Sequence, residues 1–143
     1  MKVLFFTRRF YPLIGGVETH VLQLSKQLLA KGWDVIVVTE KTDAKLAESE
    51  LVDGIYVYRI PVGGDDWFKK FRIWSEVLKL RKLIVKADVI HCHDVFFWYL
   101  PFRFLLWNKS VYTTFHGYET VYPPTKKAIG VRKLNEKLSW GNI

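Results

Sequence analysis

Three histidines and an aspartate stand where two strand-like segments end. The run HCHD brings His91, His93 and Asp94 together, and His116 follows the run YTTF. Alternate side chains of an extended strand share a face, so His91 and His93 are expected on the same side. Imidazole exchanges protons near neutral pH and is the commonest metal ligand in proteins. The pattern is compatible with a metal site, with a cleft that holds a polar ligand, or with strand residues whose hydrogen bonds are satisfied.

The metal interpretation takes the H-x-H pair as two ligands and His116 as a third. Pairs of this kind occur early in the chains of barrel hydrolases, and such a barrel needs roughly 200 further residues. Only about fifty residues follow His93 here. We therefore expect no metal site. His91 is interpreted as a strand residue with a satisfied hydrogen bond, whereas His93, Asp94 and His116 are expected to face a cleft.

A glycine pair, Gly15-Gly16, follows the first apolar run and precedes a helical pattern. Glycines at this place permit a turn, or they let a ligand approach the backbone N–H groups that begin a helix. Glu18 suits the helix dipole but would repel a phosphate placed too near. The G-x-G-x-x-G dinucleotide fingerprint is absent. On these residues alone, the turn is the simpler interpretation.

The elements that must position these residues follow from hydrophobic periodicity. Strands are expected at 2–6, 34–39, 55–60, 88–93 and 110–115. Helices are expected at 17–31 and 66–86, with helix-like segments at 95–107 and 129–140 and room for a short helix in the polar connection 41–54. The first helix carries a stripe of Val17, Val21, Leu24 and Leu28, and Gly32 stands where a C-cap glycine belongs. The second carries a stripe of Trp67, Phe71, Trp74, Leu78 and Val85.

This alternation of strands and helices predicts an α/β fold, a single Rossmann-like domain with a doubly wound, mostly parallel sheet. Ligands of such sheets bind beyond the carboxyl ends of the strands. The glycine pair, His93-Asp94 and His116 should therefore meet at one edge, with the fourth strand between the first and the fifth.

Composition narrows the function classes. The chain has 143 residues, half of them hydrophobic, which suffices for one domain. Its one cysteine, Cys92, excludes an intramolecular disulfide and favours a reducing compartment. The net charge of +8 suits an acidic partner. No nucleic-acid-binding motif is visible, so nucleic acid is not expected as a partner.

The segment 67–86 concentrates basic charge behind a cluster of aromatic residues. One interpretation is a helix that lies on an anionic membrane surface. The other is an aromatic stripe that faces the core, with the basic side chains in solvent.

Three segments together resemble the N-terminal domain of a GT-B fold retaining glycosyltransferase of family 4. They are YPLIGGVETHVLQLSKQLLAKGWDVIVVT at 11–39, DVIHCHD at 88–94 and YTTFHGYE at 112–119. The order matches the family's Pro-x-x-Gly-Gly loop and helix, its D-h-h-H-x-H segment and its T-x-H-G segment. Trp33 stands where the family usually has histidine.

The resemblance implies transfer of a hexose-type sugar from a nucleotide-sugar to a hydroxyl of a lipid or saccharide acceptor, without a required metal or other cofactor. Gly15 and Gly16 would lie at the donor phosphates, and His116 would be the catalytic contact near the reaction centre. Further candidates for substrate contacts are His93, Asp94 and Glu119.

Family members also have a second Rossmann-like domain with an E-x7-E motif, which holds most of the nucleotide-sugar. The chain matches only the acceptor-side domain, so we expect it to be inactive until a C-terminal glycosyltransferase domain completes it. A fragment, half of a split enzyme and a degenerate protein all stay open. The expected location is the cytoplasm, with a peripheral position on the inner face of the membrane as an option.

Two rivals from other classes also stay open. One is a non-catalytic Rossmann-like module that binds a phosphorylated ligand. The other is a membrane-surface interaction protein.

Overall fold

One six-stranded sheet organises the chain, in the strand order β3-β4-β2-β1-β5-β6. The computed structural model spans residues 1–143, and the residues it describes are 1–64, 66–95, 98 and 100–116. The strands are β1 (Lys2–Thr7), β2 (Asp34–Glu40), β3 (Ser49–Val52), β4 (Ile55–Ile60), β5 (Val89–His93) and β6 (Ser110–Thr114). The helices are α1 (Gly16–Ala30), α2 (Lys69–Lys79), α3 (Arg81–Lys86) and the 3-10 helix η2 (Leu100–Leu106). The five strands predicted from sequence are confirmed to within one or two residues at their ends.

Strand pairing is parallel from β4 across to β6, and β5 lies between β1 and β6 as predicted. Only β3 runs antiparallel, beside β4 at the edge of the sheet. The prediction that 41–54 has room for a short helix was wrong, because β3 lies within this segment. Asp53 and Gly54 both have positive φ and close a two-residue hairpin between β3 and β4. An Asp-Gly pair between two strands is the usual signal of such a turn.

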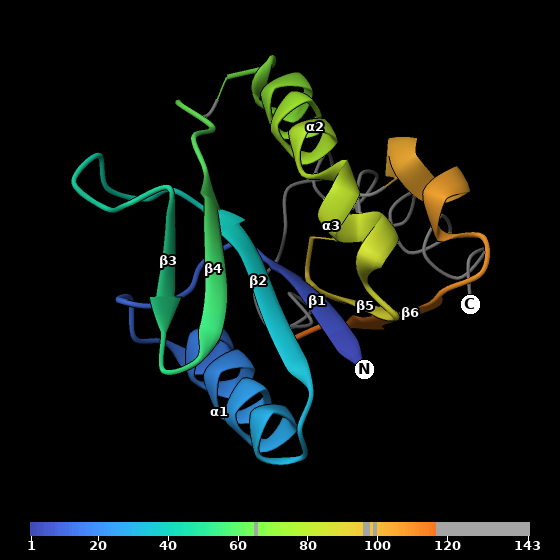
Figure 1. Cartoon of the computed structure of the whole chain (residues 1–143). Coiled ribbons are helices and arrows are strands. Elements are labelled where there is room, and N and C mark those ends of the chain that lie inside the picture. The colour runs from blue at the N-terminus through green and yellow to red at the C-terminus, as the bar shows by residue number, and fades with distance from the viewer. Residues whose placement is uncertain (65, 96–97, 99, 117–143) are drawn as a thin grey trace.

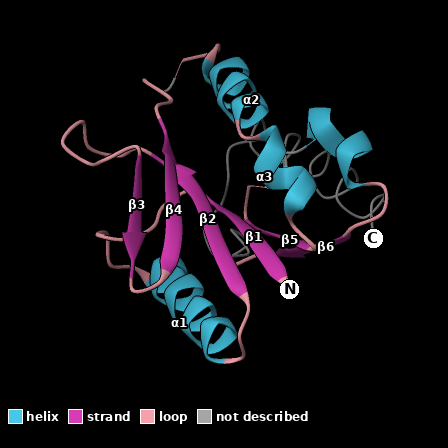
Figure 2. Cartoon of the chain, in the orientation of Figure 1, coloured by secondary structure: helices cyan, strands magenta, loops and turns pink. Residues whose placement is uncertain are grey.

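Helices cover both faces of the sheet (Figures 1 and 2), which confirms the doubly wound, Rossmann-like fold class. On one face, Val21 of α1 packs with alternate strand residues such as Val3, Phe5, Val35 and Val37. On the other face, α2, α3 and η2 pack against the intervening residues, which include Leu4, Phe6, Ile36, Val38, Ile90 and Cys92. Buried, largely β-branched strands covered on both sides are what a parallel sheet requires. Gly32 has a left-handed backbone (φ 79°) just after α1, as its position predicted.

The predicted helix 66–86 is two helices that meet at Leu80, and its buried face was predicted wrongly. The side chains that enter the core are Ile73, Val77 and Ile84. Of the predicted stripe, Trp74 alone packs against the core, whereas four residues are exposed: Trp67, Phe71, Leu78 and Val85. Helical spacing identifies possible stripes, but packing against the sheet decides which of them is buried.

Part of the sequence-based prediction lies outside the described residues, namely Glu119 and the helix-like segment 129–140. Within the helix-like segment 95–107, residues 100–106 form the 3-10 helix η2. Among the helices that the structure describes, none is both long and apolar enough to cross a membrane.

Candidate functional site

The ends of β5 and β6 are tied together at the carboxyl edge of the sheet. The backbone N–H of Asp94 donates to the carbonyl of Thr114 (3.1 Å). The backbone N–H of His116 donates in return to Oδ1 of Asp94 (3.0 Å). Asp94 adopts a positive φ of 60° to make this turn. The carboxylate of Asp94 therefore fixes the place of His116 through the backbone.

His20, His93 and His116 form a cluster at this edge, which we call the histidine cluster. Nδ1 of His93 lies 2.7 Å from Nε2 of His116, and the two rings stack with centroids 5.0 Å apart. The ring of His20 lies edge-on to both, at 5.0 Å from His116 and 5.7 Å from His93. One ring nitrogen from each histidine lies within 4.8 Å of the other two.

The fold explains why His20 meets His93. His93 pairs with Thr7 and stacks near Phe5, so its ring points to the face that α1 covers. His20 lies four residues after Gly16, one turn into α1. The structure therefore brings the start of α1 and His116 to one edge of the sheet, as predicted. Sequence analysis did not select His20, although its position one turn after the glycine pair was a usable signal.

His91 and His93 share a face, and their rings stack at 4.3 Å. Nε2 of His91 lies 2.7 Å from Oγ1 of Thr114, so His91 is the strand residue with a satisfied hydrogen bond that we expected. His93 differs from expectation, because its side chain is 0% exposed rather than open to a cleft. It contacts His116, which is partly exposed.

Burial keeps the two strand histidines neutral. Desolvation is the main cause, with the neighbouring imidazoles adding to it, and together they lower the pKa of His93 to about 3 and that of His91 to about 4. At pH 7 each of the two rings therefore has one protonated and one unprotonated nitrogen.

These low pKa values predict that acid destabilises the fold. Between about pH 4 and pH 6.5 the unfolded chain binds protons on His91 and His93 that the folded chain excludes, so the free energy of unfolding falls as pH falls. The loss approaches about 1.4 kcal/mol per pH unit for each histidine. Urea unfolding at pH 7.5, 6.5 and 5.5 measures this loss in the free energy of unfolding. A chelator in the buffer keeps metal ions away from the histidines. His91→Gln should make the profile shallower, and a flat profile from the unmodified chain would contradict the prediction.

The loop between β1 and α1, which delivers the glycine pair, is fastened to the sheet. Oγ1 of Thr39 donates to the carbonyl of Arg8 (3.2 Å). The buried guanidinium of Arg59 donates to the carbonyl of Tyr11 (2.9 Å) and forms an ion pair with Glu50. These contacts hold the first part of the loop, at Arg8 and Tyr11, against the sheet.

Neither glycine is needed for a special backbone conformation. Gly15 is extended (φ −156°), and Gly16 is the first residue of α1. A Cβ on Gly16 would meet no atom within 4 Å, whereas one on Gly15 would collide with the carboxylate of Glu18. The turn interpretation therefore loses its support. Gly16 borders open space at the start of a helix, and Glu18 lies against Gly15, where an incoming anion would have to displace it.

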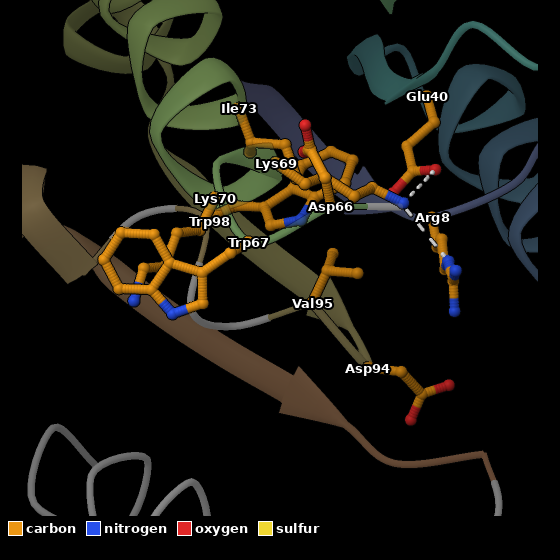
Figure 3. A pocket seen from close by; sticks show the side chains of 10 residues that line it. All are labelled: Arg8, Glu40, Asp66, Trp67, Lys69, Lys70, Ile73, Asp94, Val95 and Trp98. Carbon is orange, nitrogen blue, oxygen red and sulfur yellow. Dashed lines mark hydrogen bonds and ion pairs between the residues drawn. The ribbon is translucent and has the colours of Figure 1, made fainter. Parts of the chain in front are cut away.

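A pocket of about 470 Å³ has Asp94 in its lining (Figure 3). Its volume is within the usual range for small-molecule sites. Its walls come from the ends of β1, β2 and β5 and from the start of α2, and ten residues line it: Arg8, Glu40, Asp66, Trp67, Lys69, Lys70, Ile73, Asp94, Val95 and Trp98. The carboxylate of Glu40 lies between Arg8 (3.8 Å) and Lys69 (3.4 Å). From the sequence, Asp94 was expected at a cleft and 67–86 at a membrane surface, but the pocket as a whole was not predicted, because its residues come from four separate segments.

Aromatic residues at the start of α2 are exposed beside this pocket. Trp67 is 70% exposed, and Phe68 and Phe71 are exposed as well. Nζ of Lys70 lies 4.8 Å from the centre of the Trp67 ring. The core-facing interpretation of these aromatic side chains is therefore wrong. We call Trp67, Phe68, Lys70 and Phe71 the aromatic rim.

The basic charge of this region is smaller than the sequence suggests. Lys69 pairs with Glu40, Arg72 with Asp66 and Lys79 with Glu76. The guanidinium of Arg72 lowers the pKa of Asp66 through hydrogen bonds and charge. An anionic partner would therefore meet fewer uncompensated charges than the seven basic residues of 67–86 imply.

Asp94 thus connects the pocket to the histidine cluster. The cluster, together with the first N–H groups of α1 and the open space at Gly16, suits an anion or a polar group. The pocket has charged and aromatic walls, which suit a polyhydroxyl compound with apolar ring faces.

Comparisons with known proteins point to one family. Residues 14–140 match the family model described as Glycosyltransferase Family 4. A GDP-mannose:cellobiosyl-diphosphopolyprenol alpha-mannosyltransferase of Xanthomonas campestris is 33% identical over 94% of this chain. The GPI3 subunit of the phosphatidylinositol N-acetylglucosaminyltransferase of Saccharomyces cerevisiae is 28% identical over 59% of the chain. The chain spans 36% and 19% of the lengths of these two relatives.

The fold has counterparts among solved structures. Sucrose-phosphate synthase from Thermosynechococcus elongatus superposes with a TM-score of 0.59 at 18% identity. The match covers 89% of this chain and 36% of that chain. At this identity the likeness shows the fold alone, which agrees with the sheet order and the helices on both faces.

Proposed function

The chain belongs to glycosyltransferase family 4, and from this premise we propose that it is the acceptor-side domain of a nucleotide-sugar-dependent retaining glycosyltransferase. The observation that carries the proposal is that Asp94 connects the pocket to the histidine cluster. A transferase must hold two substrates with their reacting atoms in contact, and effective alignment of this kind supplies much of the rate. Asp94 lines the pocket and also holds His116 in place.

The donor diphosphate is proposed to lie at Gly16 and His116. Open space at Gly16 lets the phosphates approach the first N–H groups of α1, where the helix dipole favours anions. His116 would donate a hydrogen bond to the charge that develops on the leaving diphosphate, an electrostatic role that requires no metal. Gly15 takes part once the carboxylate of Glu18 has turned away.

The acceptor is proposed to occupy the pocket. The name of the Xanthomonas campestris relative specifies a saccharide on a diphosphopolyprenol as its acceptor. We extend this class to the present chain. Trp67 offers a flat face for a sugar ring, Glu40 accepts hydrogen bonds from hydroxyls, and Arg8 and Lys70 offer positive charge to a lipid-linked diphosphate.

Gly16→Ala tests the donor half of this proposal. We expect KM for the donor to rise about tenfold, because the new methyl group enters the space proposed for the phosphates. The variant should unfold at an unchanged or slightly higher temperature, since alanine at a compatible position stabilises by about 0.4–1 kcal/mol. The measurement is steady-state kinetics with GDP-mannose, using the chain joined to the remaining C-terminal part of the Xanthomonas campestris relative.

Gly64→Ala is the matched control. Gly64 also borders open space, so it gains a methyl group without a clash. Its kinetics should match those of the unmodified protein. If the donor KM of the Gly16→Ala variant equals that of the unmodified protein, the donor does not bind at this end of α1.

A peripheral membrane position on the cytoplasmic side is proposed for the aromatic rim, which stands beside the acceptor pocket. Exposed aromatic side chains favour the interfacial region of a bilayer, and nearby lysines favour anionic lipids. A rim of this kind would bring the pocket close to lipid-linked acceptors.

Vesicle co-sedimentation tests the rim. The chain should bind vesicles with 30–40% anionic lipid more than neutral vesicles, and salt should weaken the binding. A Trp67→Ser, Phe68→Ser double variant should lose most of it. Trp107→Ser is the control, because Trp107 is 88% exposed but lies at the end of η2. Equal loss in both variants, or equal binding to both vesicles, would contradict a specific membrane contact.

A further inference from the structure

Three of the four histidines in the chain converge from three different elements, and the proposed transfer reaction uses only one of them. His20 comes from α1, His93 from the end of β5, and His116 follows β6. We propose that the histidine cluster binds a divalent first-row transition-metal ion such as Zn²⁺. The ligand set differs from the H-x-H pair considered from sequence, because His20 takes the place of His91.

The positions of the nitrogens fit such an ion after small side-chain movements. Zinc lies about 2.0–2.1 Å from imidazole nitrogens, so tetrahedral ligands are roughly 3.3 Å apart. The facing nitrogens of His93 and His116 are 2.7 Å apart and share a hydrogen bond in the metal-free protein. The full set lies within 4.8 Å. Metal binding requires this pair to open by about 0.6 Å and His20 to close in. His20 is exposed on the first turns of α1, where its side chain has room to rotate.

The donor set selects the class of ion. All three candidate ligands are imidazoles, which suit zinc, copper, nickel and iron, whereas magnesium and calcium prefer oxygen ligands. Asp94 is the nearby carboxylate, but its Oδ1 accepts the backbone N–H of His116. Three protein ligands leave a fourth position for water or a substrate oxygen.

The orientation of the His93 ring fixes which of its nitrogens could bind the ion. Nδ1 faces Nε2 of His116 and would be the ligand atom. Nε2, which has no hydrogen-bond partner within the described part of the chain, would then carry the ring proton.

Metal binding would link the start of α1 to the ends of β5 and β6. Because a ligand that binds only the folded state stabilises it, the melting temperature should rise with metal concentration. The ion would also occupy His116, so it should inhibit transfer by competing with the donor. This last consequence rests on the proposed function, whereas the metal site itself does not.

The test uses the tag-free chain after EDTA treatment and buffer exchange. Titration with Co²⁺ should give visible absorption bands typical of nitrogen-ligated cobalt, with one ion per chain, and Zn²⁺ should displace it. His20→Gln should weaken Co²⁺ binding at least 100-fold, and His116→Gln should do the same. Because His20 is exposed, this variant should keep the melting temperature of the metal-free chain.

His91→Gln is the matched control, since His91 lies on the same strand but outside the ligand set. It should bind Co²⁺ within about threefold of the unmodified chain. An unmodified chain that takes up no Co²⁺, or a His20→Gln chain that binds as well as the unmodified one, would overturn the site. So would a His91→Gln chain that loses as much affinity as His20→Gln. Zinc that binds through His20 without inhibiting the joined enzyme would confirm the site and count against the role proposed for His116.

Discussion

Purified as 143 residues, the chain is expected to turn over no nucleotide-sugar, even with acceptor present. In the proposed function, the described residues supply one wall for the donor, at Gly16 and His116, and a pocket for the acceptor. In the proposed function the remaining donor contacts belong to a second half of the protein. Loss of simultaneous positioning removes the largest entropic contribution to the rate, so we expect turnover about 10⁴-fold or more below that of the joined protein.

The assay measures the release of nucleoside diphosphate. The acceptor is a saccharide linked to a short-chain prenyl diphosphate. The joined protein, which adds the C-terminal part of the Xanthomonas campestris relative, serves as the positive control. Transfer by the 143 residues without any partner would contradict the acceptor-side assignment. The same assay without acceptor separates true transfer from hydrolysis of the donor.

In the joined protein, His116→Ala is expected to lower kcat about 100-fold. His116 is the partly exposed member of the histidine cluster, held by Asp94 through its backbone and by His93 through its ring. Removing one hydrogen-bond donor to a developing anion typically costs a factor of about 10²–10³. KM should change less than kcat, because the contact is proposed to strengthen as the diphosphate departs.

A structural effect must be separated from this loss. Alanine leaves Nδ1 of His93 without its partner, and an unpaired buried polar atom costs about 1–3 kcal/mol. The melting temperature should fall by several degrees, which unfolding curves would record. His116→Gln restores a polar side chain toward His93 and should recover stability without recovering the rate. A variant that recovers both would show that His116 acts only through packing.

Several features could be predicted from local patterns. Apolar, β-branched runs such as 34–39 and 55–60 form buried strands at the predicted places. Gly32 ends α1 as its position indicated. The order of strands and helices was enough for the Rossmann-like class, because parallel strands need crossover helices and meet at one edge. His93, Asp94 and His116 could therefore be expected near one another before any contact was known.

Other features depended on which surfaces meet in three dimensions. The aromatic stripe of 67–86 satisfied helical spacing, yet Ile73 and Val77 enter the core, because only one face of α2 meets the sheet and spacing alone does not identify that face. The burial of His93 and the hydrogen bond of His91 likewise depend on neighbours more than twenty residues away.

The sequence by itself determined five of the six strands, the parallel class of the sheet, the edge at which polar residues gather and the resemblance to family 4, since each of these follows from short-range periodicity and motif order. Only the tertiary structure decided that His20 joins His93 and His116, that Gly16 borders empty space, and that Asp94 connects a histidine cluster to a pocket. The physical reason is that such groupings depend on helix docking and strand register, which bring residues up to 96 positions apart into contact. No local pattern of side chains encodes a distance across that many residues.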